Sequence, residues 1–310
     1  MKKVFIDGSA GTTGLRIFER LGKRDDIELI AISEKDRKDL ECRKEAIKSA
    51  DAAFLCLPDS AAAEICEALP DCQTKILDTS TAHRTTPGWA YGFPELSEDF
   101  RDNIKTSNRI AVPGCHASGF ISLVYPLTAS GIMPKDYPIV SYSVTGYSGG
   151  GKNMIAEYQS QDRDIELSSP RQYGLTQNHK HLPEITKICS LKNEPIFAPI
   201  VADYYSGMVV SVPVFSSMLK GNPSVSDIHA IYKKHYENQP AVHVMPCGIN
   251  GFLGSNNLSG RDILEIEISG NDDRILLAAR FDNLGKGSSG AAIQCMNLTL
   301  GFDETKGLDL

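Results

Sequence analysis

The sequence predicts an α/β protein in which a doubly wound parallel sheet is joined to a second, α+β domain with a mixed or antiparallel sheet. Short apolar strands alternate with helical segments through the first third of the 310 residues, which is typical of a parallel sheet. A glycine-rich loop directly follows the first strand. After Cys115 the strand-like runs become longer and richer in β-branched residues, and several alternate apolar with polar side chains. That change indicates a mixed or antiparallel sheet.

Hydrophobic patterning places the elements of the first third. Strands are expected at residues 4–7, 27–33, 50–58, 75–80 and 109–112, and a helix at 61–69. Another helix is expected directly after the glycine-rich loop, where apolar residues recur at helical spacing. Its expected apolar face consists of Leu15, Ile17, Phe18 and Leu21. We therefore expect residues 1–114 to form the first domain.

The rest of the chain predicts the second domain. The expected strands are 138–145, 195–201, 207–215, 263–269 and 274–281, and an apolar helical run closes the chain at 288–300. We expect residues 115–285 to form this domain. The C-terminal segment, 286–310, is expected to return to the first domain as a helix.

The glycine-rich loop has the spacing Gly-x-x-Gly-x-x-Gly rather than the commoner Gly-x-Gly-x-x-Gly. Glycines three residues apart permit a tight turn and a close approach of the main chain to a pyrophosphate, which the following helix N-terminus would hold. The strand–loop–helix context favours a Rossmann-type dinucleotide site over a plain glycine-rich turn. The expected cofactor-binding residues are Gly8, Ser9, Ala10, Gly11, Thr12, Thr13 and Gly14.

The end of the second predicted strand bears on which dinucleotide binds. An NAD site usually places a carboxylate here, whereas the 2′-phosphate of NADP requires hydroxyls and cations. Ser33, Lys35 and Arg37 therefore favour NADP, while Glu34 keeps NAD possible. The alternative is a solvated charged loop.

Cys115 occupies the turn between the strand at 109–112 and a helical run at 117–127, directly after Pro113 and Gly114. Amides at a helix N-terminus favour a thiolate, so this position predicts a lowered thiol pKa. They also supply donors for an oxyanion on an attacked carbonyl. With the dinucleotide loop, the thiol indicates acyl chemistry coupled to hydride transfer. The local sequence alone leaves open a buried cysteine that packs as a small hydrophobe.

Two histidines and a carboxylate, His179, His181 and Glu184, lie close together in the sequence. Histidine is the usual proton shuttle near neutral pH, and a thiol with a distant histidine is a common nucleophile–base arrangement. A His-x-His pair can also bind metal, but no further ligand cluster supports a metal site. The alternative is a pair of surface histidines before a helix that starts near Pro183.

Two further segments carry candidate anion-binding groups. The loop of residues 146–152 is glycine-rich and ends in Lys152, so its amides and this lysine could approach an anionic substrate. It lacks the full spacing of an ATP-type phosphate loop. Arg84 follows the fourth predicted strand, at the edge of the sheet that faces the ligand crevice. It is a candidate clamp for a phosphate or carboxylate, with a surface ion pair as the alternative.

Composition excludes several classes of function. The chain is 41% hydrophobic with a formal net charge of -7 and has no long basic block, so we expect no nucleic-acid partner. No apolar run is long enough for a membrane span, and no signal peptide is evident. The eight cysteines are scattered without a Cys-x-x-Cys pair. They predict reduced thiols in a cytoplasmic protein without a structural zinc site.

Taken together, these motifs closely resemble those of the N-acetyl-γ-glutamyl-phosphate reductases of the shorter, second type, within the semialdehyde dehydrogenase group. They follow the family's order and span essentially the whole chain. The Pro-Gly-Cys segment and the final motif, residues 282–292, are the most specific. The matching segments are 8–14, 78–84, 91–96, 112–119, 146–152, 179–185 and 282–292.

The resemblance implies an NADP-binding Rossmann domain and a second domain with catalytic and oligomer contacts, in a homodimer or homotetramer. It implies NADPH-dependent reductive dephosphorylation of N-acetyl-γ-glutamyl phosphate to N-acetylglutamate semialdehyde, in arginine biosynthesis. Cys115 would form a thioester with the acyl group, and His179, or else His181, would move the proton. Asn283 would contact the cofactor. The implied substrate-binding residues are Arg84, Ser148, Gly149, Lys152 and Glu184.

Two alternatives stay open at this point. A related reductase could act on an aspartyl or aminoadipyl phosphate. A catalytically inactive nucleotide sensor on the same scaffold is disfavoured, because a sensor has no use for a placed thiol.

Overall fold

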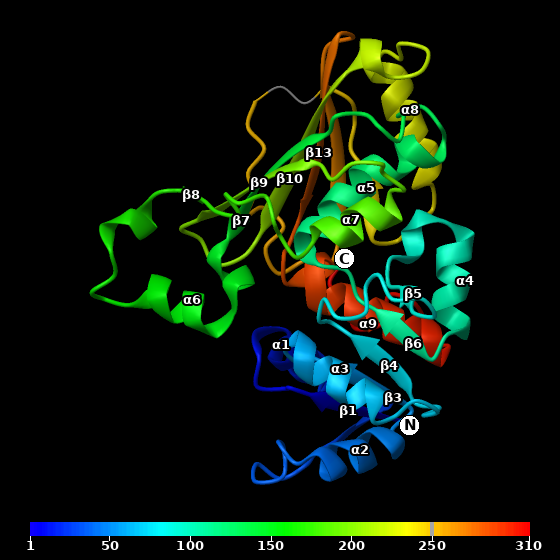
Figure 1. The fold of residues 1–310 in the computed structure, drawn as a ribbon, viewed down its shortest axis with the longest axis vertical. Helices are drawn as coiled ribbons and strands as arrows, with labels where there is room; N and C mark the ends of the chain where they lie inside the picture. The colour runs from blue at the N-terminus through cyan, green and yellow to red at the C-terminus, as the bar shows by residue number, and fades with distance from the viewer. Residues whose placement is uncertain (249–250) are drawn as a thin grey trace. The chain divides into compact units, whose positions relative to one another are not determined.

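The computed structural model describes residues 1–248 and 251–310, which form two compact units (Figure 1). The first unit consists of residues 1–114 and 288–308. The second consists of residues 115–287 and 309–310.

The first unit contains a six-stranded, all-parallel sheet in the order β2-β1-β3-β4-β6-β5. The expected doubly wound parallel sheet is therefore confirmed. Its strands are β1 (Lys2–Asp7), β2 (Ile27–Ile30), β3 (Ala52–Leu55), β4 (Lys75–Asp78), β5 (Ala90–Tyr91) and β6 (Arg109–Ala111).

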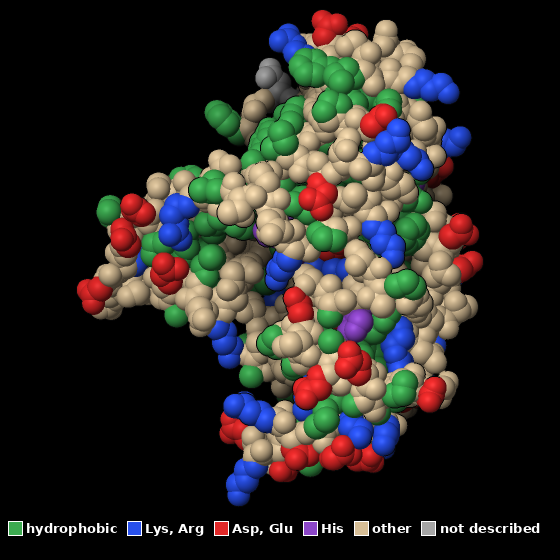
Figure 2. Space-filling model, viewed as in Figure 1, with side chains coloured by type: hydrophobic (Ala, Val, Ile, Leu, Met, Phe, Trp, Pro, Cys, Tyr) green, Lys and Arg blue, Asp and Glu red, His purple; other side chains and the backbone are tan. Residues whose placement is uncertain are grey.

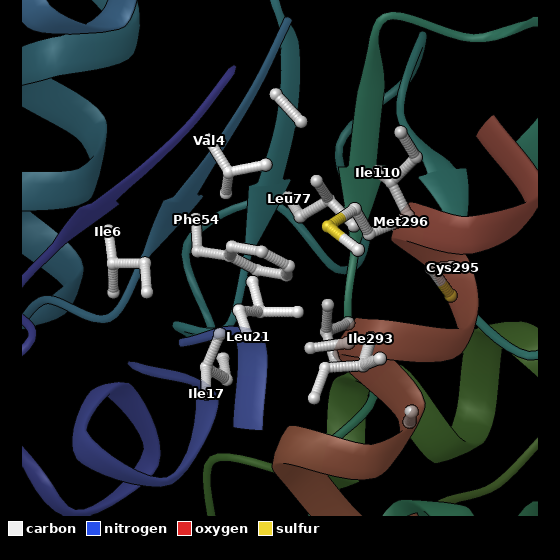
Figure 3. Close-up of a cluster of buried hydrophobic side chains, with 14 of the residues drawn as sticks. Val4, Ile6, Ile17, Leu21, Phe54, Leu77, Ile110, Ile293, Cys295 and Met296 are labelled. Atoms are coloured by element: carbon white, nitrogen blue, oxygen red, sulfur yellow. The ribbon is translucent and has the colours of Figure 1, made fainter. Parts of the chain in front are cut away.

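Helices cover both faces of this sheet. They are α1 (Thr12–Leu21), α2 (Leu40–Lys48), α3 (Asp59–Glu67), α4 (Glu98–Thr106) and α9 (Gly290–Leu300). On one face, Ile17 of α1 and Ile293 of α9 pack with strand residues such as Phe54 (Figure 3). On the other face, Ile47 of α2 and Ile65 of α3 form a second cluster. Two apolar clusters on opposite faces are what a doubly wound sheet requires.

The strand order creates a switch point between β1 and β3. The chain passes from β1 to β2 on one side and then returns to β3 on the other side of β1. In open parallel sheets, ligands bind outside the carboxyl ends of the strands at such a switch point. The glycine-rich loop leaves β1 at this place.

The apolar face expected for the first helix is partly wrong. Ile17 and Leu21 are buried, but Leu15 and Phe18 are 46% and 47% exposed. Residues i and i+4 share one face of a helix, so the 17/21 pair faces the sheet and the neighbouring pair points away. Phe18 instead lines a pocket beside the glycine-rich loop.

The second unit contains a seven-stranded mixed sheet in the order β11-β12-β13-β10-β7-β9-β8. Most neighbouring strands are antiparallel, but β7 pairs with β9, and β11 with β12, in parallel. The expected mixed sheet is confirmed. Its strands are β7 (Val140–Gly146), β8 (Arg171–Gln172), β9 (Ile196–Ala202), β10 (Met208–Phe215), β11 (Val242–Val244), β12 (Leu264–Gly270) and β13 (Arg274–Phe281).

Helix α5 (Cys115–Ala129) is the central helix of this unit, and nearly all of its residues after Cys115 are buried. Its Gly119 lies so close to β10 and β13 that a Cβ there would be 2.5 Å from the Val210 side chain. The other helices are α6 (Gly151–Gln159), α7 (Leu182–Ile188) and α8 (Val225–His235). Figure 1 shows α5, α7 and α8 on one side of the sheet.

Element boundaries differ from the expected ones at several ends. The strand expected at 50–58 is limited to Ala52–Leu55. The helix expected from residue 117 begins at Cys115, so the thiol lies on the first helical residue. The closing helix expected from 288 begins at Gly290, after a π-helical turn at Gly285–Ser289. Hydrophobic patterning did not predict three elements of the first unit: α2, α4 and the short edge strand β5.

Candidate active site

The glycine-rich loop of the first unit is packed so tightly that two of its glycines exclude any side chain. Gly8 has φ +85°, and a Cβ there would lie 2.2 Å from the Cys56 carbonyl oxygen at the end of β3. A Cβ on Gly14 would lie 2.4 Å from the Gly8 carbonyl oxygen. Gly11 is different, because its Cβ would meet that oxygen at an ordinary 3.4 Å. The loop therefore keeps its main chain uncovered at the start of α1, which fits a dinucleotide pyrophosphate.

A pocket of about 380 Å³ opens beside this loop. Of the predicted cofactor residues, Gly8, Ser9, Ala10 and Arg37 line it, and Thr13 of α1 instead contacts Ser288, with 3.0 Å between the two hydroxyl oxygens. Lys38, which was not among the predicted residues, also lines the pocket.

Only some residues of the charged segment 33–38 line the pocket. Arg37 lies 3.5 Å from the Glu34 carboxylate, and both residues line the pocket. Ser33 donates its hydroxyl to Asp36 at 2.6 Å, and neither Ser33 nor Lys35 is among the lining residues. Arg37 and Lys38 are thus the two cations at the rim that could meet a 2′-phosphate.

A buried ion pair supports the start of the loop. Asp7, the last residue of β1, accepts a hydrogen bond of 2.8 Å from Arg43 of α2, and both side chains are buried. Burial raises the pKa of the Asp7 carboxyl, while the guanidinium acts in the opposite direction. Breaking such a pair leaves an uncompensated buried charge, so it fixes the exit of β1 against α2.

Arg84 and the residues around it lie at the carboxyl end of β4. Arg84 is buried and donates hydrogen bonds to the carbonyl oxygens of Val112 and Thr79 at 2.9 and 3.1 Å. Asp78 accepts a hydrogen bond from the amide of Ser80 at 2.9 Å and contacts the ring of His83 at 2.7 Å. The Arg84 guanidinium is therefore firmly placed, and its role as a substrate clamp stays a prediction.

In the second unit, Cys115 is the first residue of α5 and is only partly buried. Gly287 of the final motif approaches it closely, since a Cβ on Gly287 would lie 3.0 Å from the Cys115 Cβ. The sequence placed these two motifs far apart, and the fold brings them together. The thiol thus lies at the N-terminus of α5, with little space on its Gly287 side.

The residue after the thiol, His116, is buried and uses both ring nitrogens. Nδ1 is 2.8 Å from the Ser143 hydroxyl of β7, and Nε2 is 2.7 Å from the Tyr173 hydroxyl, just after β8. Burial, with a smaller effect from His179, lowers the pKa of His116 to about 3. Burial raises the pKa of Tyr173 well above its usual value, and Cys115 adds to this.

The predicted acid–base pair lies against the same imidazole. The rings of His179 and His181 are 5.6 and 5.7 Å from that of His116, centroid to centroid. The His181 amide donates to His179 Nδ1 at 3.2 Å. Burial, aided by the charge of Lys180, lowers the pKa of His179 to about 4. Because Nδ1 of His179 accepts this hydrogen bond, the neutral ring carries its proton on Nε2. A second proton would have to bind at Nδ1, where it would displace the hydrogen bond from the His181 amide.

The predicted substrate loop meets the final motif inside the second unit. Asn283 accepts a hydrogen bond from the Gly207 amide at 2.8 Å and donates one to the Ser148 hydroxyl at 3.0 Å. Both ends of its amide are thus engaged within this unit. Lys152 is exposed in the first turn of α6, and Glu184 is buried in the first turn of α7.

The match to known families covers both units. Residues 3–106 match the model of the semialdehyde dehydrogenase NAD binding domain, and residues 115–283 match that of the semialdehyde dehydrogenase dimerisation domain. N-acetyl-gamma-glutamyl-phosphate reductases of Brucella ovis and Brucella melitensis are each 44% identical over 306 residues, covering 96% of this chain and 99% of the relative. The chain belongs to the semialdehyde dehydrogenase family, in its N-acetyl-γ-glutamyl-phosphate reductase branch.

Solved semialdehyde dehydrogenases share the fold of this family member. Aspartate semialdehyde dehydrogenase II of Vibrio cholerae, complexed with ASA, has a TM-score of 0.73 at 15% identity and covers 97% of this chain and 98% of its own. The enzyme of Francisella tularensis has a TM-score of 0.72 at 17% identity, with 96% and 99% covered. At such identities the likeness concerns the fold alone.

Three residues around the thiol of this semialdehyde dehydrogenase, His116, Ser143 and Tyr173, were not predicted from the sequence. His116 had a signal, because it directly follows Cys115. Ser143 and Tyr173 had none, since a serine within a strand and a tyrosine beside a loop are unremarkable until the sheet places them together. Among the residues that the structure describes, no cluster of His, Cys, Asp and Glu side chains is arranged to hold a metal. Within the same residues, no helix has the length and apolarity needed to cross a membrane.

Proposed function

We propose that this chain catalyses the NADPH-dependent reductive dephosphorylation of N-acetyl-γ-glutamyl phosphate to N-acetylglutamate semialdehyde, in arginine biosynthesis. The observation that carries the proposal is the thiol of Cys115 on the first residue of α5, in a chain of the reductase branch. The glycine-rich loop and its pocket provide the dinucleotide site that a reductase requires.

The first unit supplies residues that fit NADP. The loop of residues 8–14 would hold the pyrophosphate, and Arg37 and Lys38 would meet the 2′-phosphate at the pocket rim. A fold relative from Candida albicans, with a TM-score of 0.68, is described as bound to NADP. When bound, NADPH supplies the hydride that reduces the acyl group.

The second unit supplies the covalent chemistry. The Cys115 thiolate attacks the acyl carbon, so that a carbon–sulfur bond forms, the carbon–oxygen bond to the phosphate breaks, and phosphate leaves. The resulting thioester is more easily reduced than a carboxylate, which is the reason for the covalent route. After reduction to a thiohemiacetal, the carbon–sulfur bond breaks, and the aldehyde and the thiolate are released. Amides at the start of α5 would stabilise the oxyanion in the addition steps.

The predicted substrate-binding residues and Asn283 keep their proposed roles. Ser148, Gly149, Lys152 and Glu184 would bind substrate groups from the second unit, and Arg84 would bind an anionic group from the first. Asn283 would contact the cofactor, for which one of its two hydrogen bonds would have to be exchanged.

The function is tested in the oxidative direction. Purified protein is mixed with N-acetylglutamate semialdehyde, phosphate and NADP, and NADPH formation is followed by absorbance. We expect turnover that requires phosphate and is absent in Cys115→Ala. Parallel reactions with aspartate semialdehyde and aminoadipate semialdehyde test the related substrates. Turnover with one of these and none with N-acetylglutamate semialdehyde would refute the substrate assignment.

Cofactor preference gives the first specific prediction. Arg37→Gln and Lys38→Gln should each raise the KM for NADPH by about tenfold or more, because each removes a charge-assisted hydrogen bond to the 2′-phosphate. The KM for NADH should change little. Lys35→Gln is the matched control, since Lys35 lies outside the pocket lining. Equal effects on both cofactors would show that these cations do not bind the 2′-phosphate.

The acid–base pair gives the second prediction. His179→Asn should lower kcat by about 10²–10⁴-fold, the usual cost of losing a general base, while NADP binding persists. With the His179 pKa at about 4, activity that needs the neutral ring should fall as the pH drops through that value. The pH–rate profile of each variant is the measurement. A larger loss in His181→Asn would make His181 the proton carrier, and an unchanged profile in both would exclude the pair.

We also propose that the chain forms homodimers, or homotetramers built from them, through the open face of the seven-stranded sheet. Val140, Tyr142, Ile196 and Phe215 are 38%, 37%, 58% and 54% exposed and lie on the face opposite to the helices. Figure 2 shows apolar side chains at the surface in the region of these strands. A contiguous exposed apolar surface is typical of an interface. Sedimentation of Tyr142→Lys, which should be monomeric, tests this face.

We place the reaction in the cytoplasm. The mechanism needs a reduced thiol, and a reducing compartment keeps thiols in that state. All eight cysteines lie among the described residues, and none is in a disulfide.

A further inference from the structure

One imidazole has no role in the chemistry outlined above, although it lies next to the thiol in the chain. His116 is 3% exposed. Its ring packs against His179, His181 and Phe197, with centroid separations of 5.6, 5.7 and 5.3 Å. It is therefore at the centre of an aromatic cluster that includes both candidate proton carriers.

His116 also joins three segments that are distant in the chain. Its own backbone is in α5, its Nδ1 contacts Ser143 of β7, and its Nε2 contacts Tyr173 after β8. Tyr173 is further held by its amide, which donates to the Pro199 carbonyl of β9 at 3.0 Å. The first turn of α5, which carries Cys115, is thus fastened to the sheet through this ring.

The protonation of the ring restricts what it can do. Burial keeps His116 neutral at working pH, since its pKa is lowered to about 3. A neutral imidazole has one donor and one acceptor nitrogen, and here both nitrogens have partners. The ring therefore has no lone pair available for the thiol proton. It also requires one of its two hydroxyl partners to donate and the other to accept, so it orients both.

We propose that His116 is a positioning residue for the thioester chemistry: it fixes the Tyr173 hydroxyl and the His179 ring beside the first turn of α5 and takes no part in proton transfer. This inference rests on the proposed function. The titratable groups that face the cluster are Cys115 of α5, Tyr173 after β8, and His179 and His181 before α7. Lys180 adds its charge to the environment of His179.

Three variants separate positioning from proton transfer. Tyr173→Phe is nearly isosteric and removes only the hydroxyl. His116→Gln can keep the contact to Tyr173, because its amide reaches the place of Nε2. His116→Asn can keep only the contact to Ser143. Circular dichroism confirms that each variant folds, and kcat and KM are then measured across pH.

We expect Tyr173→Phe and His116→Asn to lower kcat about tenfold to a hundredfold, the range that a small misplacement of reacting groups costs. KM should stay within about twofold of the wild-type value. His116→Gln should retain more activity than His116→Asn, and the acid limb of the pH profile should persist in all three. Disappearance of that limb in the His116 variants would make His116 the proton carrier and overturn the proposal. Wild-type kcat in all three would overturn it as well.

A measurement without substrate keeps this inference separate from the proposed function. The His179 ring is titrated by NMR in the wild type and in His116→Asn. The smaller side chain admits water, so the His179 pKa should rise toward its usual value by about one unit or more, because burial is the main cause of its lowering. An unchanged titration would refute the positioning role. If instead the wild type reduced no acyl phosphate while this shift was observed, the proposed function would fail, and only the structural part of the inference, that His116 fixes the His179 ring, would stand.

Discussion

Replacing Cys115 with serine should lower turnover by about three orders of magnitude or more, the scale seen when a covalent nucleophile is lost. A serine hydroxyl is far harder to ionise than a thiol at neutral pH, so the attack on the acyl carbon is lost. The fold should be unaffected, because the two side chains are similar in size and Cys115 is only partly buried. Steady-state assay and NADPH titration of the variant are the measurements, and we expect NADPH binding to persist.

Cys66→Ser is the matched control for this variant. Cys66 is also partly buried, on α3, but burial raises the pKa of its thiol to about 12. Cys66→Ser should therefore keep near wild-type activity, and alkylation at neutral pH should inactivate the enzyme through Cys115 without modifying Cys66. Substantial turnover in Cys115→Ser would show that the reaction does not pass through a thioester on this residue.

Gly14→Ala should both destabilise the protein and weaken NADPH binding. Gly14 lies within α1, where helix propensity alone favours alanine over glycine by about 1 kcal/mol. The added Cβ, however, would lie 2.4 Å from the Gly8 carbonyl oxygen, and that main-chain atom has no rotamer by which to move away. Overpacking of this kind costs about 1–3 kcal/mol. We expect a lower Tm and a KM for NADPH raised by about tenfold or more.

Gly11→Ser is the control for Gly14→Ala in the same loop. Gly11 is the N-cap of α1, where serine is a favoured residue, and its Cβ would have an ordinary contact of 3.4 Å. The Tm of the unliganded variant should therefore be close to that of the wild type. A raised Tm in Gly14→Ala would mean that helix propensity dominates and that the loop tolerates the side chain, contrary to the close approach in the structure.

The fold class was predictable because it depends on local patterns. A strand in a parallel sheet is buried on both faces and appears as a short apolar run, so β1, β3 and β4 were all expected. The glycine-rich loop was equally clear, because Gly8 needs a positive φ and Gly14 excludes a side chain. Motifs of this kind consist of neighbouring residues whose chemistry and conformation are set within a few positions of the chain.

Helix orientation was less predictable. Leu15 and Phe18 have the same hydrophobicity signal as Ile17 and Leu21, yet they are about half exposed. Four apolar residues within two turns can present either of two faces, and contact with the sheet selects one. Of the two exposed residues, Phe18 lines the pocket beside the glycine-rich loop.

The sequence by itself determined the two-part α/β architecture, the dinucleotide loop and the identity of the candidate nucleophile, since each is encoded by adjacent residues. Only the tertiary structure decided that Gly287 lies against Cys115, that Asn283 bonds Ser148, and that His116 bonds Tyr173. These pairs are separated by tens of residues or more, and their meeting depends on strand order and register. A hydrogen bond forms within about 3 Å, a distance that no local pattern encodes.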